Sequence, residues 1–307
     1  MKVLLCGDID AADWRVWREA LAAAMPEAQW LDRDAALAAP DEVQAAVVAN
    51  PIAGSLQGLP RLRLVQSLWA GVDRLLADPT LPAGVPLARM VDPLMTEAMA
   101  ETALWAVLSL HRGFFAYARR QTGAEWRVHA QRRADEVGVL VLGQGEMGRA
   151  CAARLAHQGY RVQGWRRDGQ PLATLLGAAA IVVNLLPLTP DTRGLLDARF
   201  FAALPAGAGI VNLARGAHVV DADLLAALGG DGSGGEGGHI GHAVLDVFQT
   251  EPLPAQHPYW RHPRVTVLPH AAALTDPRSA AAVAVANLRA LRDGGAITHL
   301  VDRQRGY

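Results

Sequence analysis

The segment that most restricts the fold of this chain is VLVLGQGEMGRACAARLAHQG, residues 139–159. An apolar run leads into glycines with GxGxxG spacing, and a helical pattern follows. Between a strand and a helix such glycines allow a tight turn and let the backbone approach a pyrophosphate, whose charge the helix N-terminus favours. We interpret this turn as a dinucleotide-binding site, with an ordinary glycine-rich connection as the alternative. The candidate cofactor residues are Gly143, Gln144, Gly145, Glu146, Met147 and Gly148.

Short apolar runs alternate with helical patterns along the whole chain, which predicts an α/β fold with parallel sheets. Helical periodicity over 92–120 predicts one helix that joins two domains, and residues 276–295 predict a last helix that returns to the first domain. The predicted strands cover 2–7, 45–50, 64–68 and 86–89, then 136–143, 160–165, 181–187, 209–214, 242–248 and 265–270.

These elements predict two Rossmann-like or flavodoxin-like doubly wound domains. Residues 1–95 plus 275–307 would form a discontinuous substrate-binding domain, and residues 96–274 a dinucleotide-binding Rossmann domain. We expect the active site in the cleft between the two domains.

Composition excludes several classes of partner. The 307 residues carry a formal net charge of −1, so there is no basic surplus for nucleic acid or an anionic membrane. The apolar stretches are too short, or too interrupted by charge, to cross a bilayer, and MKVLLCGDID does not fit a signal peptide. Cys6 and Cys151 lie far apart in apolar stretches, as expected for reduced thiols. We expect a cytoplasmic protein.

The strand after the glycine turn bears on the choice of cofactor. An acidic residue at its end would accept hydrogen bonds from an NAD ribose, but this chain has GWRRD, with Trp165, Arg166 and Arg167 before the first acid, Asp168. Two guanidinium groups can bind a 2′-phosphate and Trp165 can flank the adenine. The sequence therefore favours NADPH over NADH, while a solvated pair of charges in a loop is the alternative.

Three polar residues stand at the ends of successive predicted strands. They are Arg215 in VNLARG, Glu251 in DVFQTEP and His270 in VLPHAA. Taken singly, each could be structural or solvent-facing. Together, at the edge where a parallel sheet binds ligands, they match the needs of 2-oxo acid reduction. The arginine binds the substrate carboxylate, the histidine supplies a proton, and the glutamate keeps the histidine protonated.

These motifs, with LPLTPDTRGLLD and the N-terminal LVQSLWAGVDRLL, resemble the D-2-hydroxyacid dehydrogenase family over nearly the whole chain. GWRR and the closing VDRQRGY look most like its glyoxylate/hydroxypyruvate reductase A branch. The resemblance implies that Arg215, Glu251 and His270 are catalytic and that Asp246 faces the nicotinamide carboxamide. It also implies cofactor-groove positions for Leu186, Pro187 and Ala214, and backbone amides that receive the substrate carboxylate at Trp69, Ala70 and Gly71. By the same analogy AMAETALWAVL lies at a homodimer interface.

The chain departs from the family pattern in places. GDGSGGEG within residues 229–239 reads as an inserted surface loop, His242 replaces a small residue, and no glycine follows His270 closely. His239, His242 and Glu236 lack metal-ligand spacing, so we expect no metal. His257 and His262 flank PYWR, where we expect surface positions.

The resulting hypothesis is NADPH-dependent reduction of small 2-oxo acids such as glyoxylate or hydroxypyruvate to glycolate or D-glycerate. An NAD-linked family member of the D-lactate or phosphoglycerate type is one alternative, and a non-catalytic dinucleotide-sensing protein is another. A formate dehydrogenase is disfavoured because that branch has a glutamine beside its histidine, and here Glu251 suits proton donation.

Overall fold

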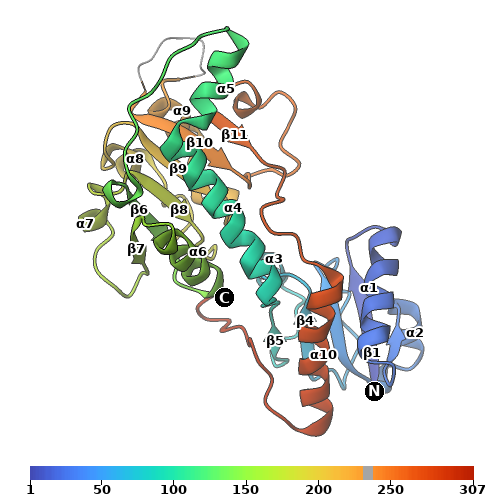
Figure 1. Cartoon of the computed structure of the whole chain (residues 1–307). Helices are drawn as coiled ribbons and strands as arrows, with labels where there is room; N and C mark the ends of the chain where they lie inside the picture. Colours follow the sequence, from blue (N-terminus) through green and yellow to red (C-terminus); the bar gives the residue numbers. More distant parts are fainter. Residues whose placement is uncertain (231–237) are drawn as a thin grey trace. The chain divides into compact units, whose positions relative to one another are not determined.

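The computed structural model describes residues 1–230 and 238–307, which separate into two compact units. Unit 1 consists of Met1–Met95 and Thr275–Tyr307, and unit 2 consists of Thr96–Leu274. Each unit contains a parallel sheet with helices packed against it (Figure 1). The predicted α/β class with two parallel sheets is therefore confirmed.

Unit 1 is built on a five-stranded sheet with the order β2-β1-β3-β4-β5, in which every neighbouring pair is parallel. The strand β2 was not predicted, because three residues are too few to show an alternating pattern. The strands are β1 (Lys2–Gly7), β2 (Gln29–Leu31), β3 (Val43–Ala49), β4 (Leu64–Ser67) and β5 (Leu87–Ala88). The helices are α1 (Ala11–Ala24), α2 (Arg33–Ala38), the 3₁₀ turn η1 (Pro40–Glu42), α3 (Asp73–Leu76) and α10 (Pro277–Asp293).

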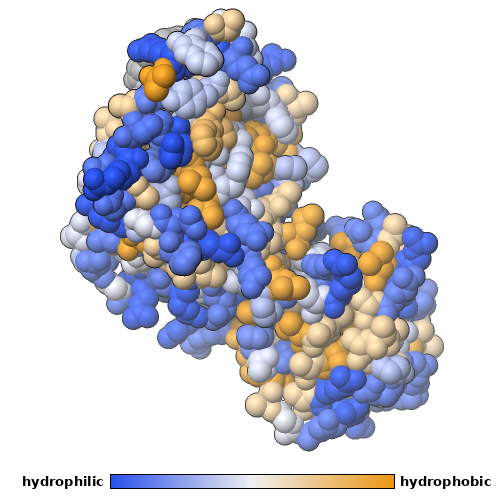
Figure 2. Space-filling view, viewed as in Figure 1, coloured by the Kyte–Doolittle hydropathy of each residue, from blue (hydrophilic) through white to orange (hydrophobic). Residues whose placement is uncertain are grey.

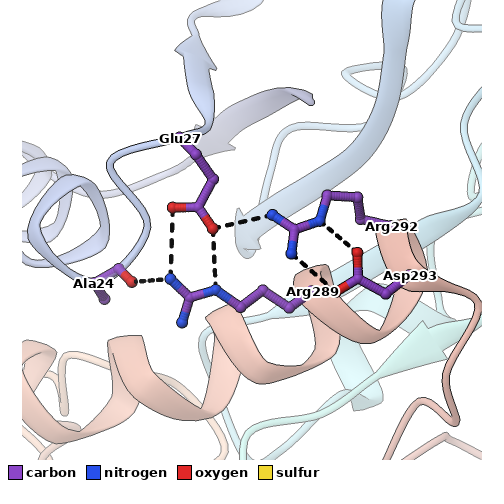
Figure 3. Close-up of polar contacts among 5 residues, drawn as sticks. All are labelled: Ala24, Glu27, Arg289, Arg292 and Asp293. Atoms are coloured by element: carbon purple, nitrogen blue, oxygen red, sulfur yellow. Dashed lines mark hydrogen bonds and ion pairs between the residues drawn. The ribbon is translucent and has the colours of Figure 1, made fainter.

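An ion-pair cluster ties the two chain segments of unit 1 together (Figure 3). The Glu27 carboxylate, just after α1, accepts from Arg289 Nε at 3.1 Å and from Arg292 Nη1 at 3.0 Å, both on α10. Arg289 also donates to the carbonyl of Ala24, and Arg292 pairs with Asp293. The pKa of Glu27 is lowered to about 2, mainly because its carboxylate accepts the hydrogen bond from Arg289. Because these side chains are exposed, the cluster fixes geometry more than it adds stability.

Unit 2 is built on a six-stranded parallel sheet with the order β11-β10-β9-β8-β6-β7. Its strands are β6 (Gly138–Leu142), β7 (Arg161–Trp165), β8 (Ile181–Asn184), β9 (Ala208–Asn212), β10 (Ile240–Leu245) and β11 (Val265–Val267). Its helices are most of α4 (Pro93–Arg112), then α5 (Phe114–Thr122), α6 (Glu146–His157), α7 (Ala173–Leu176), α8 (Ala198–Ala202) and α9 (Asp221–Ala227), with 3₁₀ turns η2 (Ala134–Glu136), η3 (Gly216–His218) and η4 (Pro258–Trp260).

The single helix predicted over 92–120 is wrong. Gly113 separates α4 from α5 with a φ of +70°, a left-handed conformation that ends a helix and that glycine adopts without steric cost. The hydrophobic period continues across this residue, so the pattern alone did not show the break.

The sheet of unit 2 is buried on both faces, which explains the continuous apolar runs in the sequence. Side chains of β6 alternate between two hydrophobic clusters. Leu140 and Leu142 pack with Phe200 and Phe201 in one cluster, whereas Val139 and Val141 pack in the other. The strands are therefore held rigidly enough to position the loops at their ends.

Other sequence predictions concern the surroundings of the chain. Among the described residues, no helix has the length and apolar character needed to cross a bilayer. Cys6 and Cys151 are both free, and burial raises the pKa of each thiol to about 12. Most of the glycine-rich segment predicted as a surface loop, residues 231–237, lies outside the described residues.

Candidate active site

Arg215, Glu251 and His270 each follow one of three neighbouring strands of unit 2. They come shortly after β9, β10 and β11, which pair in parallel on one side of the sheet. The carboxyl ends of parallel strands share one edge of a sheet, where α/β proteins place their ligands. The structure therefore brings the three loops to the same edge.

Glu251 and His270 form a direct hydrogen bond of 2.7 Å between Oε2 and Nδ1. The other carboxylate oxygen of Glu251 accepts the backbone N–H of Phe248 at 2.8 Å, which fixes its orientation. The hydrogen bond that His270 donates to Glu251 raises the pKa of His270 against the opposing effect of desolvation. Burial alone would raise the pKa of Glu251, but the bonds from His270 and Phe248 outweigh it and the pKa is lowered. The pair therefore favours a charged imidazole beside a carboxylate.

Arg215 lies close enough for its charge to act on this pair. The neighbouring Gly216 packs directly on the loop of Glu251, because a Cβ on Gly216 would lie 1.9 Å from the carbonyl carbon of Phe248. Arg215 donates from Nη1 to the carbonyl of Ala214 at 2.8 Å. Its positive charge lowers the pKa of both Glu251 and His270. A cation, a carboxylate and a protonatable imidazole thus occupy one edge of the sheet.

The turn that carries His270 is held by Asp246 at the end of β10. The N–H of His270 donates to the Asp246 backbone carbonyl, and the Asp246 carboxylate accepts the N–H groups of Ala271 and Ala272. His270 itself has a φ of +55°, which is uncommon for a residue other than glycine. Asp246 is 1% exposed, and burial raises the pKa of its carboxyl. Its contacts in this structure hold the turn, which is a structural role. The position beside a nicotinamide carboxamide stays a prediction.

The three glycines after β6 have three different surroundings. Gly143 has a φ of +95°, and a Cβ there would lie 2.6 Å from the Leu185 carbonyl oxygen. A Cβ on Gly148 would lie 1.9 Å from the Gly143 oxygen, whereas one on Gly145 would meet nothing within 4 Å. These are the turn, the close helix packing and the open approach that a dinucleotide pyrophosphate needs. The turn fits such a cofactor.

The predicted 2′-phosphate binders at the end of β7 are exposed and already have acidic partners. Arg166 pairs with Asp168 at 3.0 Å, and Arg167 forms an ion pair with Asp191. Trp165 is 8% exposed, packs in the core and donates from Nε1 to Gln170. Little of its ring is left for an adenine to contact, so its clearest role here is to support the turn.

The turns after β8 and β9 are held by a buried polar network that the sequence analysis missed. Asn184 Nδ2 bonds Asn212 Oδ1 and His218 Nδ1, both at 3.0 Å, and all three residues are fully buried. Asn212 Nδ2 donates to the backbone carbonyl of Arg215. The network also holds the predicted groove residues: Leu186 and Ala214 donate backbone N–H groups to Asn184 and Asn212, and the Pro187 carbonyl contacts His218. The sequence did contain a signal for this network: each of two neighbouring apolar strands, β8 and β9, ends in an asparagine.

Comparison with known proteins places this arrangement in a family. Residues 104–272 match the model described as D-isomer specific 2-hydroxyacid dehydrogenase, NAD binding domain. The chain is 41% identical over 279 residues to glyoxylate/hydroxypyruvate reductase A of Serratia proteamaculans, which covers 85% of this chain and 87% of the relative. The chain belongs to the D-isomer specific 2-hydroxyacid dehydrogenase family. The predicted resemblance and the enzyme class are confirmed.

Solved structures of other dehydrogenases agree with this assignment. A D-isomer specific 2-hydroxyacid dehydrogenase from Xanthobacter autotrophicus, in complex with NADPH and MES, is 38% identical with a TM-score of 0.91 and covers 100% of this chain and 99% of its own. An NADPH-dependent glyoxylate/hydroxypyruvate reductase from Sinorhizobium meliloti, in complex with NADP and sulfate, is 33% identical with a TM-score of 0.89 and the same coverage.

The predicted substrate loop of the dehydrogenase lies in unit 1, after β4. The N–H of Trp69 donates to Ser67 Oγ at 3.0 Å, and its carbonyl accepts from Ser67 Oγ and from the N–H of Met90. The amide of Trp69 thus donates to Ser67 in this structure. The carboxylate-binding role of Trp69, Ala70 and Gly71 stays a prediction.

The other histidines have structural surroundings. His262 is 3% exposed, with Nδ1 accepting from the Arg264 amide and Nε2 contacting the Gly230 carbonyl, so the predicted surface position is wrong. His242 is also buried, stacked on Phe115 and bonded to Thr266. His239 contacts the carbonyl of Leu204. Within the described residues, no group of three His, Cys, Asp or Glu side chains is arranged to hold a metal ion.

Proposed function

We propose that this enzyme reduces small 2-oxo acids such as glyoxylate or hydroxypyruvate with NADPH, giving glycolate or D-glycerate. The observation that carries the proposal is the 2.7 Å bond between Glu251 and His270 beside the charge of Arg215. Two similar proteins support it: glyoxylate/hydroxypyruvate reductase A of Serratia proteamaculans and the NADPH-dependent glyoxylate/hydroxypyruvate reductase of Sinorhizobium meliloti.

The geometry suggests how the chemistry is divided among the residues. Glu251 holds Nδ1 of His270, so the proton for the substrate oxygen comes from Nε2. The guanidinium of Arg215 binds the substrate carboxylate and polarises the carbonyl that accepts the hydride. Glu251 keeps the imidazole charged until that proton is needed. Bound NADPH supplies the hydride, and the amides of Ala70 and Gly71 are proposed to bind the substrate carboxylate as well.

The cofactor contacts follow from the same edge of unit 2. The open turn at Gly145 would hold the pyrophosphate, and Leu186, Pro187 and Ala214 would line the cofactor groove. Arg166 and Arg167 exchange their acidic partners for the 2′-phosphate, which carries more charge and offers more acceptor oxygens than a single carboxylate. This exchange is the basis of the proposed preference for NADPH over NADH.

A second copy of the chain is the proposed partner of α4, α5 and the segment after them. Hydrophobic side chains gather along α4 on the face of unit 2 shown in Figure 2. Trp105 is 41% exposed, Phe114 53% and Val128 78%, and Trp126 is fully exposed. A homodimer would remove this apolar surface from water. Light scattering after size-exclusion chromatography measures whether the chain is a dimer in solution.

The free cysteines are compatible with the cytoplasmic setting that we propose.

A panel of 2-oxo acids assayed with NADPH and with NADH tests the proposal. We expect the highest kcat/KM with glyoxylate or hydroxypyruvate and NADPH. Replacing His270 with alanine should lower the rate at least about a hundredfold, while His157→Ala, an exposed histidine on α6, should leave it unchanged. Faster turnover with NADH would favour the NAD-linked alternative. NADPH binding without turnover of any 2-oxo acid would favour a sensor.

A further inference from the structure

Unit 1 contains a cavity of about 570 Å³ that the proposed reaction does not use. It lies at the carboxyl edge of the sheet, where Gly7 ends β1, Asp32 follows β2, and Ile52 follows β3. The strand order changes direction here, because β1 has β2 on one side and β3 on the other. In open α/β sheets this switch point is the usual ligand site, and the volume is ordinary for a small-molecule pocket.

The lining of the cavity carries more positive than negative charge. Arg15, Arg18 and Arg33 line it together with the acids Glu19 and Asp32. Arg33 donates from Nη2 to the Gln57 carbonyl at 2.9 Å, but its Nη1 is buried and has no hydrogen-bond partner. Among the described residues, no carboxylate forms an ion pair with Arg33. The Arg33 guanidinium therefore keeps its positive charge at the cavity wall, where it favours an anionic ligand.

Other lining residues suit a ring and hydroxyl groups. Trp14, half-buried on α1, donates from Nε1 to the Gly7 carbonyl and lines the cavity. Asp32 uses Oδ1 to cap α2 through the N–H of Ala35. It ends the second strand of a β–α–β unit, where an acid binds ribose hydroxyls in nucleotide-binding sheets.

The acids at the start of α1 decide where a phosphate would lie. Asp10 caps the helix and Asp13 lies in its first turn, so negative charge is disfavoured at this N-terminus. The cations stand further along the helix, at Arg15 and Arg18, and at Arg33 across the cavity. A phosphate is therefore expected at the arginines and not at the helix end.

We propose that this cavity binds a mononucleotide, with its phosphate on the arginines, its ribose at Asp32 and its base against Trp14. The site belongs to unit 1 alone and does not depend on the function proposed above. It is linked to the loop after β4 through α1, because Trp17 packs edge-to-face on Trp69 with ring centroids 6.3 Å apart. Arg74 of α3 also forms an ion pair with Asp8, which lies in the loop between β1 and α1.

Equilibrium dialysis of 5′-AMP against the full chain tests the site. Saturating NADP⁺ is present, so that AMP cannot occupy the dinucleotide turn of unit 2. We expect one AMP per chain, with affinity at least tenfold weaker in Arg15→Gln/Arg18→Gln. The matched control is Arg61→Gln/Arg63→Gln, which removes two exposed arginines before β4, at the opposite edge of the same sheet, and should bind AMP as wild type does.

The outcomes separate the possibilities. Asp32→Asn keeps the cap on α2 and should also weaken AMP binding, so the test does not depend on one variant. No AMP binding, or binding unchanged in both the arginine and Asp32 variants, would overturn the proposal. Inorganic phosphate that displaces AMP at equal concentration would show a simple anion site and overturn the nucleotide assignment. If NADP⁺ does not bind, the proposed function fails. AMP binding that depends on Arg15 and Arg18 would still identify this cavity as its site.

Discussion

Replacing Gly145 with alanine should weaken cofactor binding without destabilising the fold. Gly145 caps α6 with φ −74° and ψ −169°, which alanine also adopts, and its added Cβ would meet no protein atom within 4 Å. The free energy of unfolding should therefore stay unchanged or rise by about 0.5 kcal/mol. The new methyl group fills the space through which a pyrophosphate reaches the backbone amides. Losing one charge-assisted hydrogen bond costs about 1.5–3 kcal/mol, or roughly a 10- to 150-fold weaker Kd for NADPH.

Gly148→Ala is the matched control. Its Cβ would start 1.9 Å from the Gly143 oxygen, whereas ordinary van der Waals contact begins at 3.4 Å, so α6 would have to move by about 1.5 Å. Overpacking of this kind costs about 1–3 kcal/mol of stability. Fluorescence titration with NADPH and thermal unfolding of both variants separate the effects. Wild-type NADPH affinity in Gly145→Ala, or a loss of stability as large as in Gly148→Ala, would refute this interpretation of the turn.

Three further predictions concern charged and buried groups. Arg166→Ala/Arg167→Ala should lower kcat/KM with NADPH far more than with NADH, and an unchanged ratio would contradict the 2′-phosphate role. Glu27→Gln should reduce stability slightly at pH 7 in urea unfolding, and the difference should fade as pH falls from 4.5 through about 2. Burial lowers the pKa of His242 to about 3, so wild-type stability should drop as pH falls below 6.5. His242→Leu should remove that dependence, about 3 kcal/mol at pH 4, and an unchanged pH profile would contradict the burial argument.

Much of the fold could be predicted because the signals were local and strong. The apolar runs of β3, β6 and β8 are continuous, as two-sided burial requires. The tertiary details were less visible. Gly113 ends α4 only because its backbone turns left-handed, and a glycine within a helical pattern does not reveal that. The short β2 depends on pairing with β1.

The candidate site was predictable in its residue types but not in its supports. Strand ends indicated Glu251 and His270, and the structure joins them by a hydrogen bond. The contacts of Asn184 and Asn212 depend on the register between β8 and β9, which the sequence does not show. His262 appeared exposed beside PYWR, but its ring bonds Gly230, which is far away in the chain.

The central claim is that Glu251 keeps His270 protonated for proton donation, and the pH dependence of reduction tests it most directly. Because Glu251 raises the pKa of His270 above its ordinary 6.5, kcat/KM for 2-oxo acid reduction should hold past that pH and fall as the imidazole loses its proton. In Glu251→Gln the fall should begin at a distinctly lower pH. If wild type and Glu251→Gln lose activity at the same pH, the pairing does not control the proton and the account is wrong.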